Sequence, residues 1–232
     1  MQPLYRRRIK RLFNSRKQMA EQVKSNVGNN RSDLRERIVE MANHYFRERG
    51  IKGLKMDELA AQLGISKRTL YEVFEDKETL LVACIGQNQR NAELYMQEVL
   101  ATSQNVLEVI LRGYKRSIEM SRNTNSKFIE ELHKYPKAYE AMMNRHHKDT
   151  QQTIDFFYQG VEQGLFRKDV NFPIFQELVK NWMEMMLTSD ILRKYPFQDV
   201  FESIILTSLR GISTEKGTKL LDEFIVELKK QI

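Results

Sequence analysis

The chain has 232 residues, of which 41% are hydrophobic and 30% are charged, and its net charge is +7. This composition is typical of a soluble globular protein, and the chain has no run of eighteen apolar residues that would span a membrane. The only cysteine, Cys84, excludes an intrachain disulfide and is consistent with a reducing cytoplasm.

The first 30 residues contain eight Lys or Arg and one Glu, so they account for the whole net charge. Residues 31–232 carry 30 charges of each sign. We treat residues 1–31 as a basic extension, which lacks the apolar segment of a secretory signal. Three interpretations are open: a basic arm on DNA, a solvated disordered leader or misassigned start, or an amphipathic helix on a membrane surface.

Helical spacing recurs along the rest of the chain and no strand alternation is sustained, so we predict an all-α fold. Ser32 and Ser66 are expected to cap helices, because a serine hydroxyl accepts a backbone N–H. Gly50 should end the first helix, and Gly64 should make the turn between the next two. The pattern predicts helices over residues 33–49, 56–63 and 67–74.

The remaining sequence is typical of a bundle of amphipathic helices. Asp76 is expected to cap a long helix that continues to about Leu100. Gly211 is expected to end the next-to-last helix. Beyond Leu100 the predicted helices cover residues 106–122, 128–133, 137–163, 173–194, 197–210 and 215–230.

The helix that Ser66 caps begins with polar side chains. In a helix-turn-helix, the second helix enters the major groove and turns its N-terminal residues toward the base edges. A bidentate contact from Arg68 to guanine would contribute about 1–3 kcal/mol of discrimination. The alternative is that a short apolar helix, a glycine and a serine cap arise from ordinary helical packing. The predicted DNA-contacting residues are Lys55, Ser66, Lys67, Arg68, Thr69, Tyr71 and Lys77.

Several short motifs occur together here: MDELA at 56–60, GISK at 64–67, TLY at 69–71, Phe74, and KETLL at 77–81. Because they contain this set of motifs, residues 32–82 resemble the DNA-binding domain of TetR-type (tetracycline-repressor-like) transcriptional regulators. The resemblance implies a three-helix helix-turn-helix DNA-binding domain, followed over residues 83–232 by a helical-bundle domain for effector binding and dimerisation. It also implies a homodimer, a palindromic double-stranded DNA operator, and a small effector that releases the protein from the operator. A repressor is expected, and an activator is the alternative.

The sequence departs from the family pattern at Lys55, where members often have Ser or Thr. A lysine cannot accept the N–H bond that caps a helix, although it can bind a phosphate. The basic extension is a second departure, since family members usually begin close to the first helix.

Aromatic, Met and His residues between positions 106 and 187 are candidates for a pocket that holds a small apolar or amphipathic effector, since Met-rich faces adapt to varied ligands. The alternative is ordinary core packing. The candidates are Tyr114, Phe128, His133, Tyr139, Met142, Met143, His146, Phe157, Trp182 and Met186.

Homodimerisation is expected through the helices near 173–194 and 197–211, although their apolar faces also suit the core of one subunit. No cofactor or metal is expected, because His146 and His147 are adjacent and point differently on a helix. We predict that the chain is not an enzyme, since it contains no nucleophile elbow or phosphate-binding glycine loop. A rival interpretation is a helical interaction or ligand-binding protein of the same fold that lacks specific operator binding.

Overall fold

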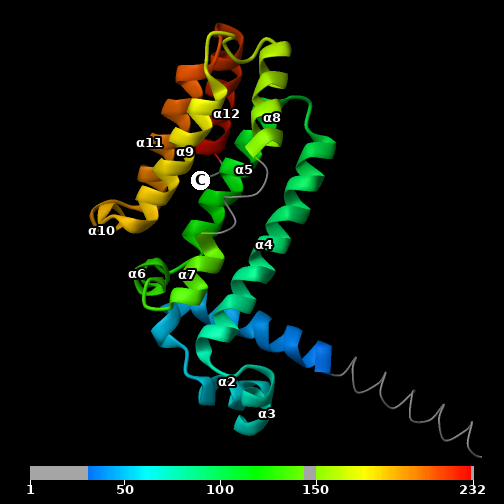
Figure 1. Cartoon of the computed structure of the whole chain (residues 1–232), viewed down its shortest axis with the longest axis vertical. Helices are drawn as coiled ribbons and strands as arrows, with labels where there is room; N and C mark the ends of the chain where they lie inside the picture. The colour runs from blue at the N-terminus through cyan, green and yellow to red at the C-terminus, as the bar shows by residue number, and fades with distance from the viewer. Residues whose placement is uncertain (1–30, 144–149, 231–232) are drawn as a thin grey trace, which may run out of the picture.

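The computed structural model describes residues 31–143 and 150–230, and all the regular elements in these ranges are helices (Figure 1). The first, which we call the N-terminal helix, covers residues 31–53. The others are α2 (Met56–Leu63), α3 (Lys67–Val73), α4 (Lys77–Thr102), α5 (Val106–Arg122), α6 (Lys127–Leu132), α7 (Pro136–Met143), α8 (Thr150–Glu162), α9 (Phe172–Thr188), α10 (Ile191–Lys194), α11 (Phe197–Ile212) and α12 (Glu215–Lys230). The predicted all-α fold is confirmed.

The α2–α3 turn forms as the sequence predicts. Gly64 adopts a left-handed backbone with φ 67°, and its N–H donates to the carbonyls that end α2. Ser66 Oγ accepts the N–H of Thr69 at 3.0 Å and so caps α3. Glycine reaches a positive φ at little cost, whereas a residue with a Cβ does not. The tight connection between the two helices therefore depends on Gly64.

Asp76 caps α4, and its Oδ1 accepts the N–H of Thr79 at 2.6 Å. This hydrogen bond lowers the pKa of Asp76. The stabilisation is therefore complete above the ordinary aspartate pKa and is lost as the pH falls through the lower folded-state value. Asp76→Ala is expected to reduce the free energy of unfolding by about 1 kcal/mol at pH 7. Denaturant titrations of both proteins at a series of pH values check this, and a difference that does not diminish as the pH falls below the ordinary aspartate pKa would contradict it.

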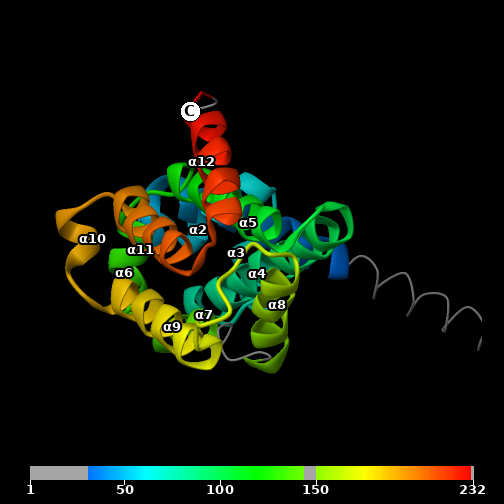
Figure 2. The ribbon, with the colours of Figure 1, turned by 90° about the horizontal axis from the view of Figure 1, so that it is seen from above.

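The helices enclose two hydrophobic cores. The first combines the N-terminal helix, α2, α3 and the start of α4 with two residues from later in the chain, Leu132 of α6 and Ala138 of α7. The second lies among α5, α8, α9, α11 and α12, which are grouped together in the view from above (Figure 2). The long helix α4 runs from the first core toward the second (Figure 1). A displacement of α4 would therefore act on the first core directly and on the second through α5, which α4 contacts.

Several predicted boundaries were wrong. Ser32 does not cap the first helix, because residues 31 and 32 are already helical. The helix predicted over 173–194 is interrupted, since Ser189 Oγ accepts the N–H of Ile191 and separates α9 from α10. Gly211 lies inside α11, which ends one residue later. A glycine ends a helix where the backbone turns left-handed, and Gly211 has no positive φ.

The predicted helix 137–163 is described as α7 and α8, and the residues between them lie outside the described ranges. The basic extension up to residue 30 also lies outside them, so the three interpretations of its role stay open.

Candidate nucleic-acid interface

Helix α3 lies with α2 at one end of the molecule, away from the second core (Figure 1). Leu70 is completely buried, and Phe74, just beyond the helix, is almost completely buried. One side of α3 is therefore held against the first core. Ser66, Lys67 and Arg68 are exposed at the opposite, N-terminal edge. The apolar residues thus determine which side chains of α3 face solvent, and these are the polar ones.

The two leading cations of α3 each contact an acid. Lys67 Nζ lies 2.8 Å from Asp57 Oδ2, and Arg68 Nε lies 2.9 Å from Glu72 Oε1. These hydrogen bonds raise the pKa of both basic groups. Exposed pairs of this kind contribute little to stability, so a DNA phosphate or base can replace the carboxylate. Asp57 and Glu72 were not predicted as partners of these cations, although the spacing of Arg68 and Glu72 by four residues indicates the second pair.

The remaining predicted contacts differ in exposure. Lys55 is exposed at the start of α2 and provides no side-chain cap, as its residue type predicts. Thr69 is half-buried, and the side chain of Tyr71 is 41% exposed. Lys77 is half-buried, and its Nζ donates to the carbonyl of Ile51 at 3.1 Å. Burial lowers the pKa of Lys77. Five of the predicted residues, Lys55, Ser66, Lys67, Arg68 and Tyr71, are therefore exposed, whereas Thr69 is half-buried and Lys77 is held against the end of the N-terminal helix.

Two arginines of the N-terminal helix hold the far end of α3. Arg31 Nη2 donates to the carbonyl of Glu72 at 3.1 Å. The guanidinium of Arg35 lies over the ring of Phe74, 5.1 Å from its centroid. A cation near the C-terminus of a helix is favourable for the helix dipole. Sequence reasoning did not find these contacts, because they join residues about 40 positions apart.

Residues 38–84 match the family described as "Bacterial regulatory proteins, tetR family". The helix-turn-helix domain is of the TetR type. An HTH-type transcriptional regulator of Staphylococcus aureus (strain USA300) is 37% identical over 62 residues, which are 27% of this chain and 32% of that protein. The chain therefore spans about a third of the length of the curated relatives it matches.

Solved structures extend the similarity to the whole fold. A TetR-family transcriptional regulator from Agrobacterium tumefaciens superposes with a TM-score of 0.58 at 13% identity, covering 79% of this chain and all of the other. Regulatory protein TetR from Rhodobacter sphaeroides superposes with a TM-score of 0.58 at 16% identity, and the alignment covers 76% of this chain and 97% of the other. A gamma-butyrolactone receptor superposes with a TM-score of 0.57 at 14% identity, and the alignment covers 88% of this chain and 100% of the other. At these identities the similarity shows that the TetR-type domain is followed by the same helical architecture.

The structure does not bring the predicted effector residues together. Tyr114, Phe157 and Met186 belong to the second core, and burial raises the pKa of Tyr114 to about 12. Phe128, Tyr139 and Met142 pack against the first core instead. The others are His133, exposed at the end of α6, Met143 and Trp182, both half-buried, and His146, which lies outside the described residues.

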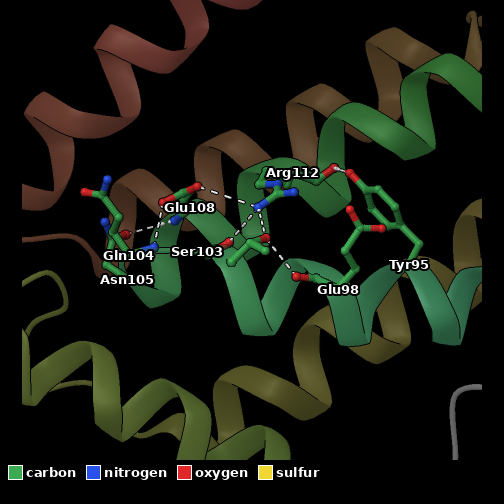
Figure 3. A network of polar contacts seen from close by, with 8 residues as sticks. Tyr95, Glu98, Ser103, Gln104, Asn105, Glu108 and Arg112 are labelled. Atoms are coloured by element: carbon green, nitrogen blue, oxygen red, sulfur yellow. Dashed lines mark hydrogen bonds and ion pairs between the residues drawn. The ribbon is translucent and has the colours of Figure 1, made fainter.

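A hollow of about 410 Å³ lies between α4, α5 and α12, and its lining includes Tyr95, Arg112 and Phe224. Arg112 also fixes the α4–α5 junction (Figure 3). Its Nη1 donates to Thr102 Oγ1 at 2.8 Å and to Ser103 Oγ at 3.2 Å, and its carbonyl accepts from Tyr95 Oη at 3.4 Å. A ligand in this hollow would contact α4 directly. The predicted effector residues line neither this hollow nor a shallower groove along α12.

Across residues 31–143 and 150–230, no group of three His, Cys, Asp or Glu side chains is arranged to hold a metal ion. Within the same residues, no helix is both long and apolar enough to cross a membrane.

Proposed function

We propose that this chain is a transcriptional regulator that binds a palindromic operator as a homodimer and is released from it by a small apolar or amphipathic effector. The observation that supports this is the exposed edge of Ser66, Lys67 and Arg68 on a TetR-type domain at one end of the molecule. In this arrangement α3 enters the major groove. Arg68 exchanges Glu72 for a guanine edge, and Lys67 exchanges Asp57 for a base or phosphate.

An exposed apolar stripe on α9 supports the homodimer. Ile174, Leu178 and Met185 are spaced by four and seven residues, and their side chains are 58%, 45% and 47% exposed. This spacing places them on one side of the helix, within the segment expected to dimerise. A second copy related by a two-fold axis would cover the stripe and place the two α3 helices about 34–36 Å apart, one turn of DNA.

The effector part of the proposal depends on α4 and on the helices that follow it, α5–α12, here called the body. The structurally similar gamma-butyrolactone receptor is named for a small ligand, which supports a ligand-responsive body here. A ligand beside α4 alters DNA binding if it prefers one position of that helix. A typical coupling of about 1–3 kcal/mol changes affinity about 5–150-fold.

Selection of bound sequences from random duplex DNA tests the DNA-binding part. We expect a palindrome whose half-site centres are about 10 base pairs, or a multiple of that, apart. Enrichment of a single unrepeated site would contradict the homodimer, and no enrichment at modest ionic strength would contradict operator binding. The selected duplex, labelled with a fluorophore, then reports whether a ligand that binds the protein also changes its DNA affinity.

The rival function is a ligand-binding or interaction protein of the same fold without specific operator binding. The ion pairs that already occupy Lys67 and Arg68 favour it, because they satisfy both cations without DNA. Failure of the selection, together with a stable dimer that binds a small ligand, would support this alternative.

A further inference from the structure

The N-terminal helix of the TetR-type domain is interrupted at Gly50, and the residues that pack against this interruption come from outside the domain. The backbone of the N-terminal helix turns left-handed at Gly50, where φ is 76°. Gly64, with φ 67°, has open space around its Cα, since an added Cβ would meet nothing within 4 Å. At Gly50 an added Cβ would lie 3.0 Å from Lys127 Cβ and 3.1 Å from Glu131 Oε2, both on α6. Helix α6 is therefore seated directly on the interruption.

Asn125, just before α6, donates hydrogen bonds to carbonyls of the N-terminal helix near this interruption. The backbone N–H of Asn125 donates to the carbonyl of Arg47 at 2.7 Å. Asn125 Nδ2 donates to the carbonyl of Glu48 at 3.0 Å, while its Oδ1 accepts the N–H of Lys127. Asn125 thus bonds at once to the first residue of α6 and to two carbonyls that lie just before Gly50 in the N-terminal helix.

Two carboxylates make reciprocal contacts across the seam where the α6–α7 pair meets the N-terminal helix and α4. Glu131 Oε2, on α6, accepts the N–H of Lys52 at 2.7 Å. Glu78 Oε1, on α4, accepts the N–H of Lys137 in the first turn of α7 at 2.7 Å. Each side of the seam therefore satisfies a backbone donor of the other. A charge-assisted hydrogen bond of this kind is stronger than a neutral one.

Buried contacts lie between these hydrogen bonds. Leu132 and Ala138 have exposures of 2% and 0% and belong to the first core. Gln89 Nε2 of α4 donates to the carbonyl of Ala141 at 2.8 Å. In Figure 1, α6 and α7 lie directly above the N-terminal helix, between it and the rest of the body. The α6–α7 pair is thus packed into the domain that carries α3, although it comes some 50 residues later in the chain.

We infer that α6 and α7 complete the DNA-binding unit, and that Asn125 and Glu131 are positioning residues that set the orientation of α3 relative to the body. They act through the end of the N-terminal helix, whose other end holds α3 through Arg31 and Arg35. The consequence for operator affinity rests on the proposed function. The effect on orientation does not depend on DNA.

The test uses the full chain with Glu131→Ala. Glu130→Ala is the matched control, since Glu130 is an exposed acid on the same helix. Spin labels on Gln62→Cys in α2 and Glu119→Cys in α5 report the orientation, after dilution with unlabelled chain so that only the intrachain distance is measured. Cys84 does not interfere, because it is 1% exposed and burial raises the pKa of its thiol to about 12. We expect a broadened or shifted distance distribution for Glu131→Ala and an unchanged one for Glu130→Ala.

Rescue distinguishes positioning from a general loss of structure. Glu131→Gln keeps an oxygen that can accept the Lys52 N–H, so it should restore the distance distribution and should protect this N–H from hydrogen exchange better than Glu131→Ala does. If Glu131→Ala does not fold, Asn125→Ala removes the side-chain hydrogen bonds of Asn125 and keeps the backbone bond to Arg47, and it should broaden the distribution in the same way. An unchanged distribution in every variant that folds would overturn the inference.

Operator affinity is measured separately. Glu131→Ala should weaken binding about tenfold, the equivalent of one charge-assisted hydrogen bond, and Glu130→Ala should not weaken it. A broadened distance distribution with unchanged affinity would overturn the link to α3. If the unmodified protein binds no duplex at all, the proposed function fails, and the distance measurement still decides whether α6 positions the domain.

Discussion

Replacing both Lys67 and Arg68 with alanine is expected to abolish discrimination between operator and random DNA while the protein stays folded and dimeric. Both side chains lie at the exposed leading edge of α3, and each contact to a base would contribute about 1–3 kcal/mol. Their carboxylate partners, Asp57 and Glu72, are also exposed, so the loss of the ion pairs should leave the free energy of unfolding nearly unchanged. Fluorescence anisotropy with operator and scrambled duplexes, beside a denaturant titration, measures both quantities.

The chain offers a matched control for this double change. Arg167 and Lys168 are also adjacent and exposed, and Arg167 is likewise paired with an acid, Asp169. Replacing this pair removes the same charge from the body. It should weaken binding to all duplexes slightly, through the general attraction between cations and phosphates. If both double variants lose operator affinity equally, the role assigned to the edge of α3 is wrong.

Phe74→Ala is expected to have the largest effect on stability in the TetR-type domain. The side chain is 1% exposed, lies in the first core directly after α3, and carries the guanidinium of Arg35 over its ring. Removing a buried phenyl ring typically costs about 3–5 kcal/mol, because contacts are lost and a cavity is left. That is a large part of the total stability of an ordinary domain. Denaturant unfolding monitored by circular dichroism measures the loss.

Tyr71→Ala is the control for this prediction, since Tyr71 is an aromatic residue on the same helix with 41% of its surface exposed. Its removal should change the free energy of unfolding much less, by about 1 kcal/mol or below. An equal loss in the two variants would mean that the ring of Phe74 is not held in the core as described. Because Tyr71 is also a predicted DNA contact, its variant should weaken DNA binding without unfolding the domain.

The helix-turn-helix was predictable because its determinants are local. Ser66 and Asp76 bond to an N–H three residues ahead, and Gly64 turns on its own backbone angles. The exposed edge of α3 follows from the spacing of Leu70 and Phe74, which face the core. The wrong boundaries lie where the local sequence does not decide, since Gly211 and Ser189 can each continue or end a helix depending on what packs beside them.

The effector residues show where sequence reasoning ends. Tyr114 and Tyr139 have the same aromatic, amphipathic pattern, yet one belongs to the second core and the other packs against the first. Periodicity predicts that a side chain faces inward but does not predict which interior it reaches, because that depends on how the helices cross. A pocket assembled from residue types alone therefore combined side chains from two separate cores.

The sequence by itself determined the all-helical class, the caps at Ser66 and Asp76, and the cationic start of α3, since each depends on neighbours within one or two turns. Only the tertiary structure decided that α6 and α7 pack into the unit carrying α3, that Lys77 binds the carbonyl of Ile51, and that Asp57 pairs with Lys67. These contacts join residues between 10 and 79 positions apart. Such contacts form only when the cores bring distant segments together, so no local pattern in the chain encodes them.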